Sequence, residues 1–306
     1  MRLSIFSDET GMDLPKAIPL IRKWNLGYVD LRGGIFQRPL EKLDDSQLRE
    51  VKKLLDDNRL KVGCLQSSFG KVHLPDRERL AEEARKLDRL IRASEILECR
   101  LVRTFFFWQP PNGQEKAGIG ELATRPDVLA RVMELFLPFA EQAKRAGLVL
   151  AFENCGCTKE ECFRMIDALD VPGWGFAWDP KNSWMHDKAE REQDLDGYLK
   201  KMAERTCCVH VKSTGSIWFA DNFDPIPYDR IFEVLGAVGF DGPVSIETHN
   251  ADPALSGAEA CERVLEVVRK AWPSAAPGAQ QEQCSLRAES VVRDYADHPV
   301  RFGVVG

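Results

Sequence analysis

Short apolar runs recur along the chain, and amphipathic stretches lie between many of them. Eight such runs cover residues 3–6, 27–32, 61–65, 100–106, 148–153, 175–179, 207–212 and 243–248. Near-continuous apolar runs of this length are typical of strands in a parallel sheet that is buried on both faces. The pattern therefore predicts eight parallel strands.

The stretches between the runs indicate helices. Apolar residues repeat at helical spacing over residues 44–58, 76–97, 126–145 and 256–270. Eight strands alternating with helices are the pattern of a TIM barrel. A doubly wound open sheet is the alternative, but its G-x-G-x-x-G loop is absent after the first run, where Phe6 is followed by Ser-Asp-Glu-Thr-Gly. We predict an α/β fold with one (β/α)8 barrel in residues 1–270. Residues 271–306, which open on a Pro/Ala/Gln-rich stretch, are expected to form a linker and a C-terminal tail.

Composition narrows the class of protein. Lys plus Arg number 42 and Asp plus Glu number 48 among 306 residues, so the formal net charge is −6. This acidic balance disfavours binding to a phosphate backbone, and we expect no nucleic-acid partner. No run approaches the ~18 apolar residues of a membrane helix, and Asp8, Glu9 and Asp13 stand where a signal peptide would be apolar. We therefore expect a cytoplasmic protein without a membrane partner.

Charged residues end four consecutive predicted strands. Glu153, Asp179, His210 and Glu247 each follow a largely apolar stretch. The carboxyl ends of the strands form the active-site face of a TIM barrel, so these side chains are expected to converge. Three converging carboxylates repel one another unless a cation lies between them. This oxygen-rich set suits Mn²⁺, Mg²⁺ or Co²⁺ better than a structural zinc.

Such a metal site favours chemistry next to a carbonyl group. Four protein ligands leave about two octahedral positions for adjacent oxygens of a hydroxy-ketone or hydroxy-aldehyde. The metal would then polarise the carbonyl and stabilise an enediolate. Glu153 and Glu247 lie on different strands, so they could reach the bound carbon from different sides as acid and base. Lys212 shares a strand face with His210 and is a further candidate for acid/base work or carbonyl binding.

Other polar and aromatic residues near the strand ends are candidates for substrate binding. Gln66 follows the third strand, and Arg103 lies on the fourth, where a buried ion pair with Asp30 or another early-strand carboxylate is the alternative. Trp108 ends an aromatic run and offers a ring on which a sugar could stack. Lys212 belongs to this set as well.

Four segments of the chain resemble the sugar phosphate isomerase/epimerase superfamily, whose barrels are xylose isomerase-like. They are Phe152-Glu153-Asn154, Trp178-Asp179-Pro180-Lys181-Asn182, Val209-His210-Val211-Lys212 and Gly239 to Glu247. The group includes ketose 3-epimerases, hydroxypyruvate isomerase, inosose dehydratase and endonuclease IV. The resemblance covers roughly residues 1–270. It implies that Glu153, Asp179, His210 and Glu247 bind the metal, with both glutamates as the acid/base pair, and that Asn182 contacts substrate.

The chain also departs from some members of this group. Ketose 3-epimerases carry a histidine where Asn182 stands and an arginine where Ser216 stands. The Asp-x-x-Asn and His-x-Lys pattern looks more like inosose dehydratase and hydroxypyruvate isomerase. Endonuclease IV needs additional histidines, and His73 is the only histidine before His186. The resemblance therefore does not point to DNA repair.

The leading hypothesis is a divalent-metal-dependent isomerase or epimerase of a sugar, keto-sugar or polyol, working through a metal-stabilised enediolate. Mn²⁺ is the first choice of metal, with Mg²⁺, Co²⁺ and Zn²⁺ as alternatives. A metal-dependent lyase or dehydratase of a keto-sugar or keto-inositol is the second hypothesis, and a non-catalytic sugar-binding barrel is the third. The expected partner is a small carbohydrate, and the resemblance also implies a homo-oligomer.

Overall fold

Eight parallel strands form one sheet in the computed structural model, which describes residues 1–109, 118–184, 186–212, 226–250 and 252–273. The strand order is β1-β8-β7-β6-β5-β4-β3-β2. The strands are β1 (Arg2–Ile5), β2 (Tyr28–Leu31), β3 (Lys61–Gln66), β4 (Leu101–Thr104), β5 (Val149–Glu153), β6 (Gly175–Trp178), β7 (Thr206–Lys212) and β8 (Pro243–Glu247). All eight predicted strands are confirmed. The tail predicted for residues 271–306 lies outside the described residues from 274 onward.

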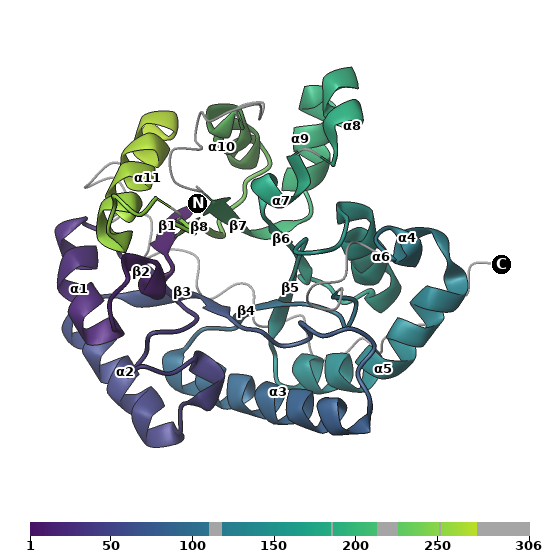
Figure 1. Cartoon of the computed structure of the whole chain (residues 1–306), viewed down its shortest axis with the longest axis horizontal. Coiled ribbons are helices and arrows are strands. Elements are labelled where there is room, and N and C mark those ends of the chain that lie inside the picture. Colours follow the sequence, from purple (N-terminus) through teal and green to yellow (C-terminus); the bar gives the residue numbers. More distant parts are fainter. Residues whose placement is uncertain (110–117, 185, 213–225, 251, 274–306) are drawn as a thin grey trace.

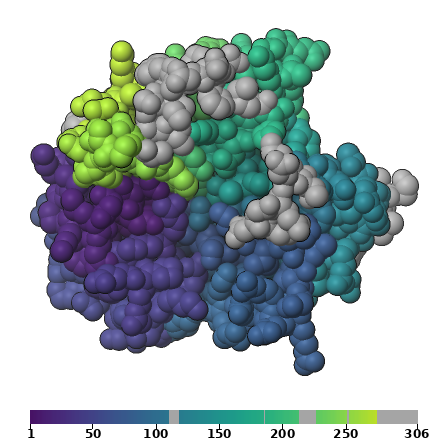
Figure 2. Space-filling view, viewed as in Figure 1, coloured from purple at the N-terminus to yellow at the C-terminus, as the bar shows by residue number. Residues whose placement is uncertain are grey.

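The sheet curls into a nearly closed barrel, with helices around the outside (Figure 1). Its end strands β1 and β2 meet through one isolated bridge between Phe6 and Asp30. The outer layer closes too, because Trp24 after α1 donates its indole N–H to Glu262 of α11 at 3.1 Å. The space-filling view shows the N-terminal and C-terminal parts of the described chain in contact (Figure 2).

Helices connect the strands and cover the sheet. They are η1 (Ser7–Thr10), α1 (Leu14–Lys23), η2 (Leu40–Lys42), α2 (Asp45–Asp57), α3 (Arg77–Leu97), α4 (Glu121–Thr124), α5 (Pro126–Arg145), α6 (Lys159–Leu169), α7 (Pro180–Trp184), α8 (Lys188–Gln193), α9 (Leu195–Ala203), α10 (Tyr228–Ala237) and α11 (Gly257–Ala271). The four predicted helices correspond to α2, α3, α5 and α11. None of the helices in the described part of the chain is both long and apolar enough to span a bilayer.

Side-chain caps fix where several helices begin. Asp44 before α2, Thr158 before α6 and Ser256 before α11 each accept a backbone N–H from the third residue of the helix. In all three, that third residue returns a side-chain contact to the cap's own N–H, which completes a capping box. The α6 cap matters for the site, because Thr158 lies only five residues after the end of β5.

Two levels of side chains fill the barrel interior. The lower level is mostly small and contains Ser4, Asp30, Cys64, Leu101, Ala151, Ala177, Cys208 and Ser245. Residues two positions later share the same strand face. These are Phe6, Arg32, Gln66, Arg103, Glu153, Asp179, His210 and Glu247. The barrel therefore carries an almost wholly polar level at its carboxyl end, supplied by all eight strands.

Candidate functional site

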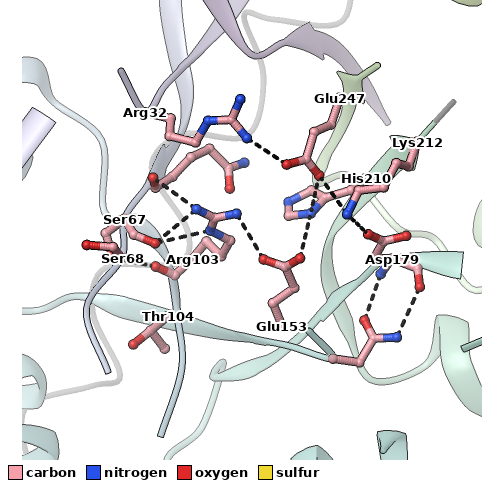
Figure 3. A network of polar contacts seen from close by, with 12 residues as sticks. Arg32, Ser67, Ser68, Arg103, Thr104, Glu153, Asp179, His210, Lys212 and Glu247 are labelled. Atoms are coloured by element: carbon pink, nitrogen blue, oxygen red, sulfur yellow. Dashed lines mark hydrogen bonds and ion pairs between the residues drawn. The ribbon is translucent and has the colours of Figure 1, made fainter. Parts of the chain in front are cut away.

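The four predicted metal ligands lie together at the carboxyl end of the barrel. One possible ligand atom from each of Glu153, Asp179, His210 and Glu247 lies within 4.8 Å of all the others, and all four residues are buried. His210 Nδ1 is 3.9 Å from Glu153 Oε1 and 3.6 Å from Glu247 Oε2. Figure 3 shows the four side chains pointing toward one another. The strand-end argument thus placed these residues correctly.

Local hydrogen bonds hold Asp179 in position. The Asn154 side chain donates to the Asp179 carbonyl and accepts from its backbone N–H, both at 3.0 Å. Asp179 Oδ1 accepts the backbone N–H groups of Lys181 and Asn182 in the first turn of α7, at 3.0 and 3.3 Å. These contacts leave Oδ2 directed at the cluster.

The cluster contains buried polar atoms that fit a divalent cation. Both ring nitrogens of His210 are buried and have no hydrogen-bond partner in the described residues. Asp179 Oδ2 and Glu247 Oε2 are buried as well, and the group that faces them is the ammonium group of Lys212. Such atoms are costly unless a partner satisfies them. A donor set of three carboxylates and one imidazole suits a hard or borderline divalent metal. The residues present therefore fit the metal that the sequence resemblance implies.

Lys212 provides the positive charge closest to the buried carboxylates. Its Nζ lies 2.5 Å from Asp179 Oδ2 and 3.5 Å from Glu247 Oε2. Burial alone would lower the pKa of Lys212, but the two carboxylates raise it above its ordinary value. The same two oxygens are candidate metal ligands, so the ammonium group and a metal ion would compete for them.

Two arginines neutralise the two glutamates from opposite sides. Arg103 donates from Nη1 to Glu153 Oε2 at 2.9 Å, and Arg32 donates from Nη1 to Glu247 Oε1 at 2.8 Å. Burial is the largest single influence and acts to raise the pKa of Glu153, but Arg103 and the other positive charges nearby together outweigh it, and the pKa falls below its ordinary value. Burial opposes ionisation of Glu247 as well, yet a hydrogen bond from His249 and the nearby positive charges hold its pKa well below normal. Both glutamates are therefore available as bases.

Sequence reasoning missed Arg32 and its two acidic partners. Arg32 follows β2 and donates from Nε to Asp8 at 2.8 Å and from Nη2 to Glu9 at 2.6 Å, in addition to Glu247. Its guanidinium also lies over the Phe6 ring, 4.8 Å from the centroid. The strand-end argument that indicated the four candidate metal ligands would have indicated Arg32 too, had it been applied to the early strands.

His249 supports Glu247 from the edge of the barrel mouth. Its Nε2 lies 2.8 Å from Glu247 Oε1, and its backbone N–H donates to Glu9 at 2.8 Å. The side chain is half exposed, so His249 combines a contact with a candidate metal ligand and a surface position. Glu9, Glu247 and His249 also lie close enough to share a cation. Arg32 already binds both of these glutamates, and so supplies that positive charge.

Arg103 is buried and forms the ion pair that the sequence left as the alternative to substrate binding. Its partner is Glu153 on the neighbouring strand, not Asp30. Its Nε and Nη2 donate to the Ser67 carbonyl at 3.2 and 3.0 Å, and Nη2 also donates to the Gln66 carbonyl at 3.3 Å. Arg103 therefore orients Glu153, and its contact with substrate stays a prediction.

The remaining substrate-binding candidates differ in what they contact. Gln66 donates from Nε2 to Asp30 at 2.6 Å, while its Oε1 is buried without a partner in the described chain. Asn182 follows Asp179, and its buried Nδ2 likewise has no partner there. Trp108 instead donates its indole N–H to Glu161 of α6 at 2.8 Å, with its ring against His73. The substrate contacts of all three stay predictions.

Solved structures share this fold at low sequence identity. A xylose isomerase-like TIM barrel protein from Mycobacterium smegmatis in complex with magnesium has 19% identity and a TM-score of 0.60, with 86% of this chain and 89% of that chain covered. D-psicose 3-epimerase from Clostridium cellulolyticum H10, solved with D-tagatose, has 16% identity and a TM-score of 0.65, with 90% and 98% covered. The IOLI protein with a bound zinc atom has 18% identity and a TM-score of 0.61, with 89% and 99% covered. No curated protein sequence matches the chain significantly.

A comparison of the sequence with protein-family models identifies the family of the chain. The model described as the xylose isomerase-like TIM barrel matches residues 19–271, which is most of the chain. The match runs from α1 to the end of α11, and so includes all four residues of the buried cluster. The chain therefore belongs to the xylose isomerase-like TIM barrel family.

Proposed function

We propose that this protein is a divalent-metal-dependent isomerase or epimerase of a sugar, keto-sugar or related polyol. The observation that carries the proposal is the buried cluster of Glu153, Asp179, His210 and Glu247, in which both ring nitrogens of His210 have no hydrogen-bond partner among the described residues. Three structural relatives support it through what they bind: magnesium, zinc and the sugar D-tagatose. The finer choice of Mn²⁺ as the native metal is part of the proposal.

The four clustered residues would hold the metal. Bound there, a divalent cation polarises the carbonyl group of a keto-sugar and makes the hydrogen on the adjacent carbon more acidic. Asp179 and His210 serve as ligands only, because backbone contacts and burial hold them in place. Lys212 would then leave Asp179 and Glu247 and face the substrate oxygens as a proton donor.

Proton transfer falls to the two glutamates. Arg103 holds Glu153 Oε2 and Arg32 holds Glu247 Oε1, so each carboxylate keeps one oxygen, Glu153 Oε1 and Glu247 Oε2, on the side of His210. Since their pKa values are lowered, both are ionised near neutral pH. One takes the proton from the carbon next to the carbonyl, and the other returns a proton to the same carbon or to its neighbour.

Substrate hydroxyl groups would be bound by uncharged polar side chains. Gln66 offers an acceptor in Oε1, and Asn182 offers a donor in Nδ2, both buried and without a partner in the described chain. Arg103 and Lys212 are the charged candidates, and Trp108 is the aromatic one. Paired donor and acceptor groups of this kind suit a polyhydroxylated ligand.

A lyase that removes water from a keto-sugar or keto-inositol is the second candidate. The same proton abstraction leads to elimination when a hydroxyl group lies one carbon further on. Lys212 favours this outcome, because a charged ammonium group beside the cluster can protonate a departing hydroxyl. Elimination gives an α,β-unsaturated product that absorbs in the ultraviolet. Isomerisation and epimerisation give no such product.

The test starts with metal content and ends with solvent exchange. Elemental analysis of wild type is expected to find about one divalent metal per chain, and Glu247→Gln is expected to lose it. Glu266→Gln, at an exposed position of α11, is the matched control and should keep the metal. Keto-sugars incubated with the loaded protein in D₂O should gain deuterium next to the carbonyl. Absence of metal in wild type, even after incubation with Mn²⁺ and dialysis, contradicts the proposal.

A further inference from the structure

Asp30 is a buried carboxylate that has no role in the proposed reaction. It is fully buried inside the barrel, in the level below the metal ligands. Its Oδ1 accepts from Ser4 Oγ at 2.6 Å and from the backbone N–H of Cys64 at 3.1 Å. Its Oδ2 accepts from Gln66 Nε2 and from Ser245 Oγ, both at 2.6 Å. Both oxygens of Asp30 are thus fully engaged as acceptors.

The position of Asp30 explains why so many groups contact it. It lies on β2 at the seam where β1 and β2 share only the bridge between Phe6 and Asp30. Its side-chain partners come from β1, β3 and β8, so the carboxylate connects strands that backbone pairing leaves loosely joined. Gly63 makes room for it, because a Cβ at that residue would lie 2.6 Å from Asp30 Oδ1. The barrel is thus built around this carboxylate.

The contact with Asp30 also determines how the Gln66 amide is turned. An accepting carboxylate oxygen can face only the NH₂ end of the amide. The amide oxygen, Oε1, is therefore turned away from Asp30, and it is buried without a partner in the described residues. Gln66 pairs in register with Arg103, which contacts the metal ligand Glu153. Gln66 thus lies level with the cluster, and Asp30 lies one level below.

We propose that Asp30 is a positioning residue, which fixes Gln66 Oε1 as a hydrogen-bond acceptor directed into the barrel mouth. A fixed acceptor takes a hydroxyl hydrogen from the ligand and repels the oxygens of a carboxylate or phosphate group. The guanidinium groups of Arg32 and Arg103 are already paired with carboxylates. The substrate class that fits this side of the site is a polyol or sugar with an uncharged hydroxyl there. This specificity rests on the proposed function, whereas the orientation of the amide does not.

Nuclear magnetic resonance tests the orientation without any substrate or metal. In protein labelled with ¹⁵N only in glutamine, Gln66→Ala identifies the Gln66 side-chain signals by their loss. In wild type these amide protons are expected to resonate downfield and to exchange slowly with water, because they are buried and one of them bonds to a carboxylate. Fast exchange at an ordinary chemical shift in wild type would overturn the proposal, whether or not the Asp30 variant folds.

Asp30→Asn then tests the cause, with Ser4→Ala as the matched control. In Asp30→Asn, an NH₂ donor can stand where the accepting oxygen Oδ2 faces Gln66 in wild type. The Gln66 amide is then expected to turn over, so that its oxygen accepts from the asparagine, and its signals should move. Ser4 contacts only Oδ1 of Asp30, and its loss should leave the Gln66 signals in place. Unchanged Gln66 signals in Asp30→Asn would overturn the proposal.

The proposed recognition of a substrate hydroxyl group by Gln66 is tested by steady-state kinetics on a keto-sugar that wild type converts. Asp30→Asn is expected to raise KM roughly tenfold with a smaller change in kcat, since about one uncharged hydrogen bond to the substrate is lost. An unchanged KM in a variant whose Gln66 signals have moved would refute the role in recognition. If no metal or turnover is found in wild type, the proposed function fails, and the resonance measurements still decide the orientation.

Discussion

Lys212 offers the sharpest test of the candidate metal site, because its ammonium group contacts two of the four candidate ligands. Nζ is 2.5 Å from Asp179 Oδ2 and 3.5 Å from Glu247 Oε2. With an effective dielectric constant of ~20, these two attractions are worth roughly 7 and 5 kcal/mol before any desolvation cost. The desolvation cost cancels much of this sum. Removing one partner of such a buried cluster typically costs about 3–5 kcal/mol.

We expect Lys212→Met to have opposite effects on stability and on metal binding. Without metal, the variant should unfold about 3–5 kcal/mol more easily than wild type, because Asp179 and Glu247 lose their nearest cation. Metal binding should become roughly 100-fold tighter, since the ion no longer has to displace an ammonium group held by about 3 kcal/mol. Metal ions should therefore restore the variant's stability more than they raise that of wild type.

The assay is thermal unfolding of metal-free protein with increasing Mn²⁺, together with calorimetric measurement of the Mn²⁺ dissociation constant. Lys86→Met is the matched control, because Lys86 pairs with the buried Glu83 at 2.7 Å on α3, a helix that supplies none of the ligands. The control should lose stability without any change in Mn²⁺ affinity. Equal Mn²⁺ affinity in Lys212→Met and wild type would refute the competition between the ammonium group and the metal.

Two further predictions concern the supports of the site. Arg103→Met should destabilise the protein by about 3–5 kcal/mol at pH 7 in denaturant titrations, because Glu153 stays buried without its ion pair. The deficit should shrink as the pH falls below 4.5, the ordinary pKa of the carboxyl group, because wild type then loses the benefit of its lowered pKa and Glu153 of the variant is protonated. A deficit independent of pH would contradict this cause. Gly70→Ala should lower the melting temperature far more than Gly147→Ala. Both glycines have positive φ, but only at Gly70 would a Cβ collide with a backbone atom, 2.3 Å from the Phe105 carbonyl oxygen. Equal losses would show that φ alone sets the cost.

The sequence was sufficient for the fold and for the four metal-ligand candidates. Strands of a parallel sheet are buried on both faces, so they leave continuous apolar runs that can be counted. Parallel strands in a barrel also bring their carboxyl ends to one face. A charged residue that follows such a run, as Glu153 and Glu247 do, must lie at that face whatever the details of packing. The buried cluster follows from these two facts.

The sequence did not predict which side chains pair with one another inside the barrel. Alternation along a strand determines which face a side chain occupies, but it does not say which neighbour the side chain meets. If Arg103 formed an ion pair, it was expected to meet Asp30 or another early-strand carboxylate. It pairs with Glu153 instead, because β4 lies beside β5 in the sheet. Trp108 bonds Glu161 of α6 through its indole N–H, a partner that the sequence did not indicate, while its contact with substrate stays a prediction.

Arg32 and Asp30 depend on the tertiary structure in the same way. Arg32 joins Asp8 and Glu9 to Glu247, which is 215 residues away along the chain. Asp30 has donors from three other strands, so its role is visible only once the barrel has closed. The sequence by itself determined which residues reach the barrel interior, because strand periodicity and burial are local properties. Only the tertiary structure decided which charges pair and which polar atoms remain open to a ligand, because those contacts depend on strand register and on closure of the ring.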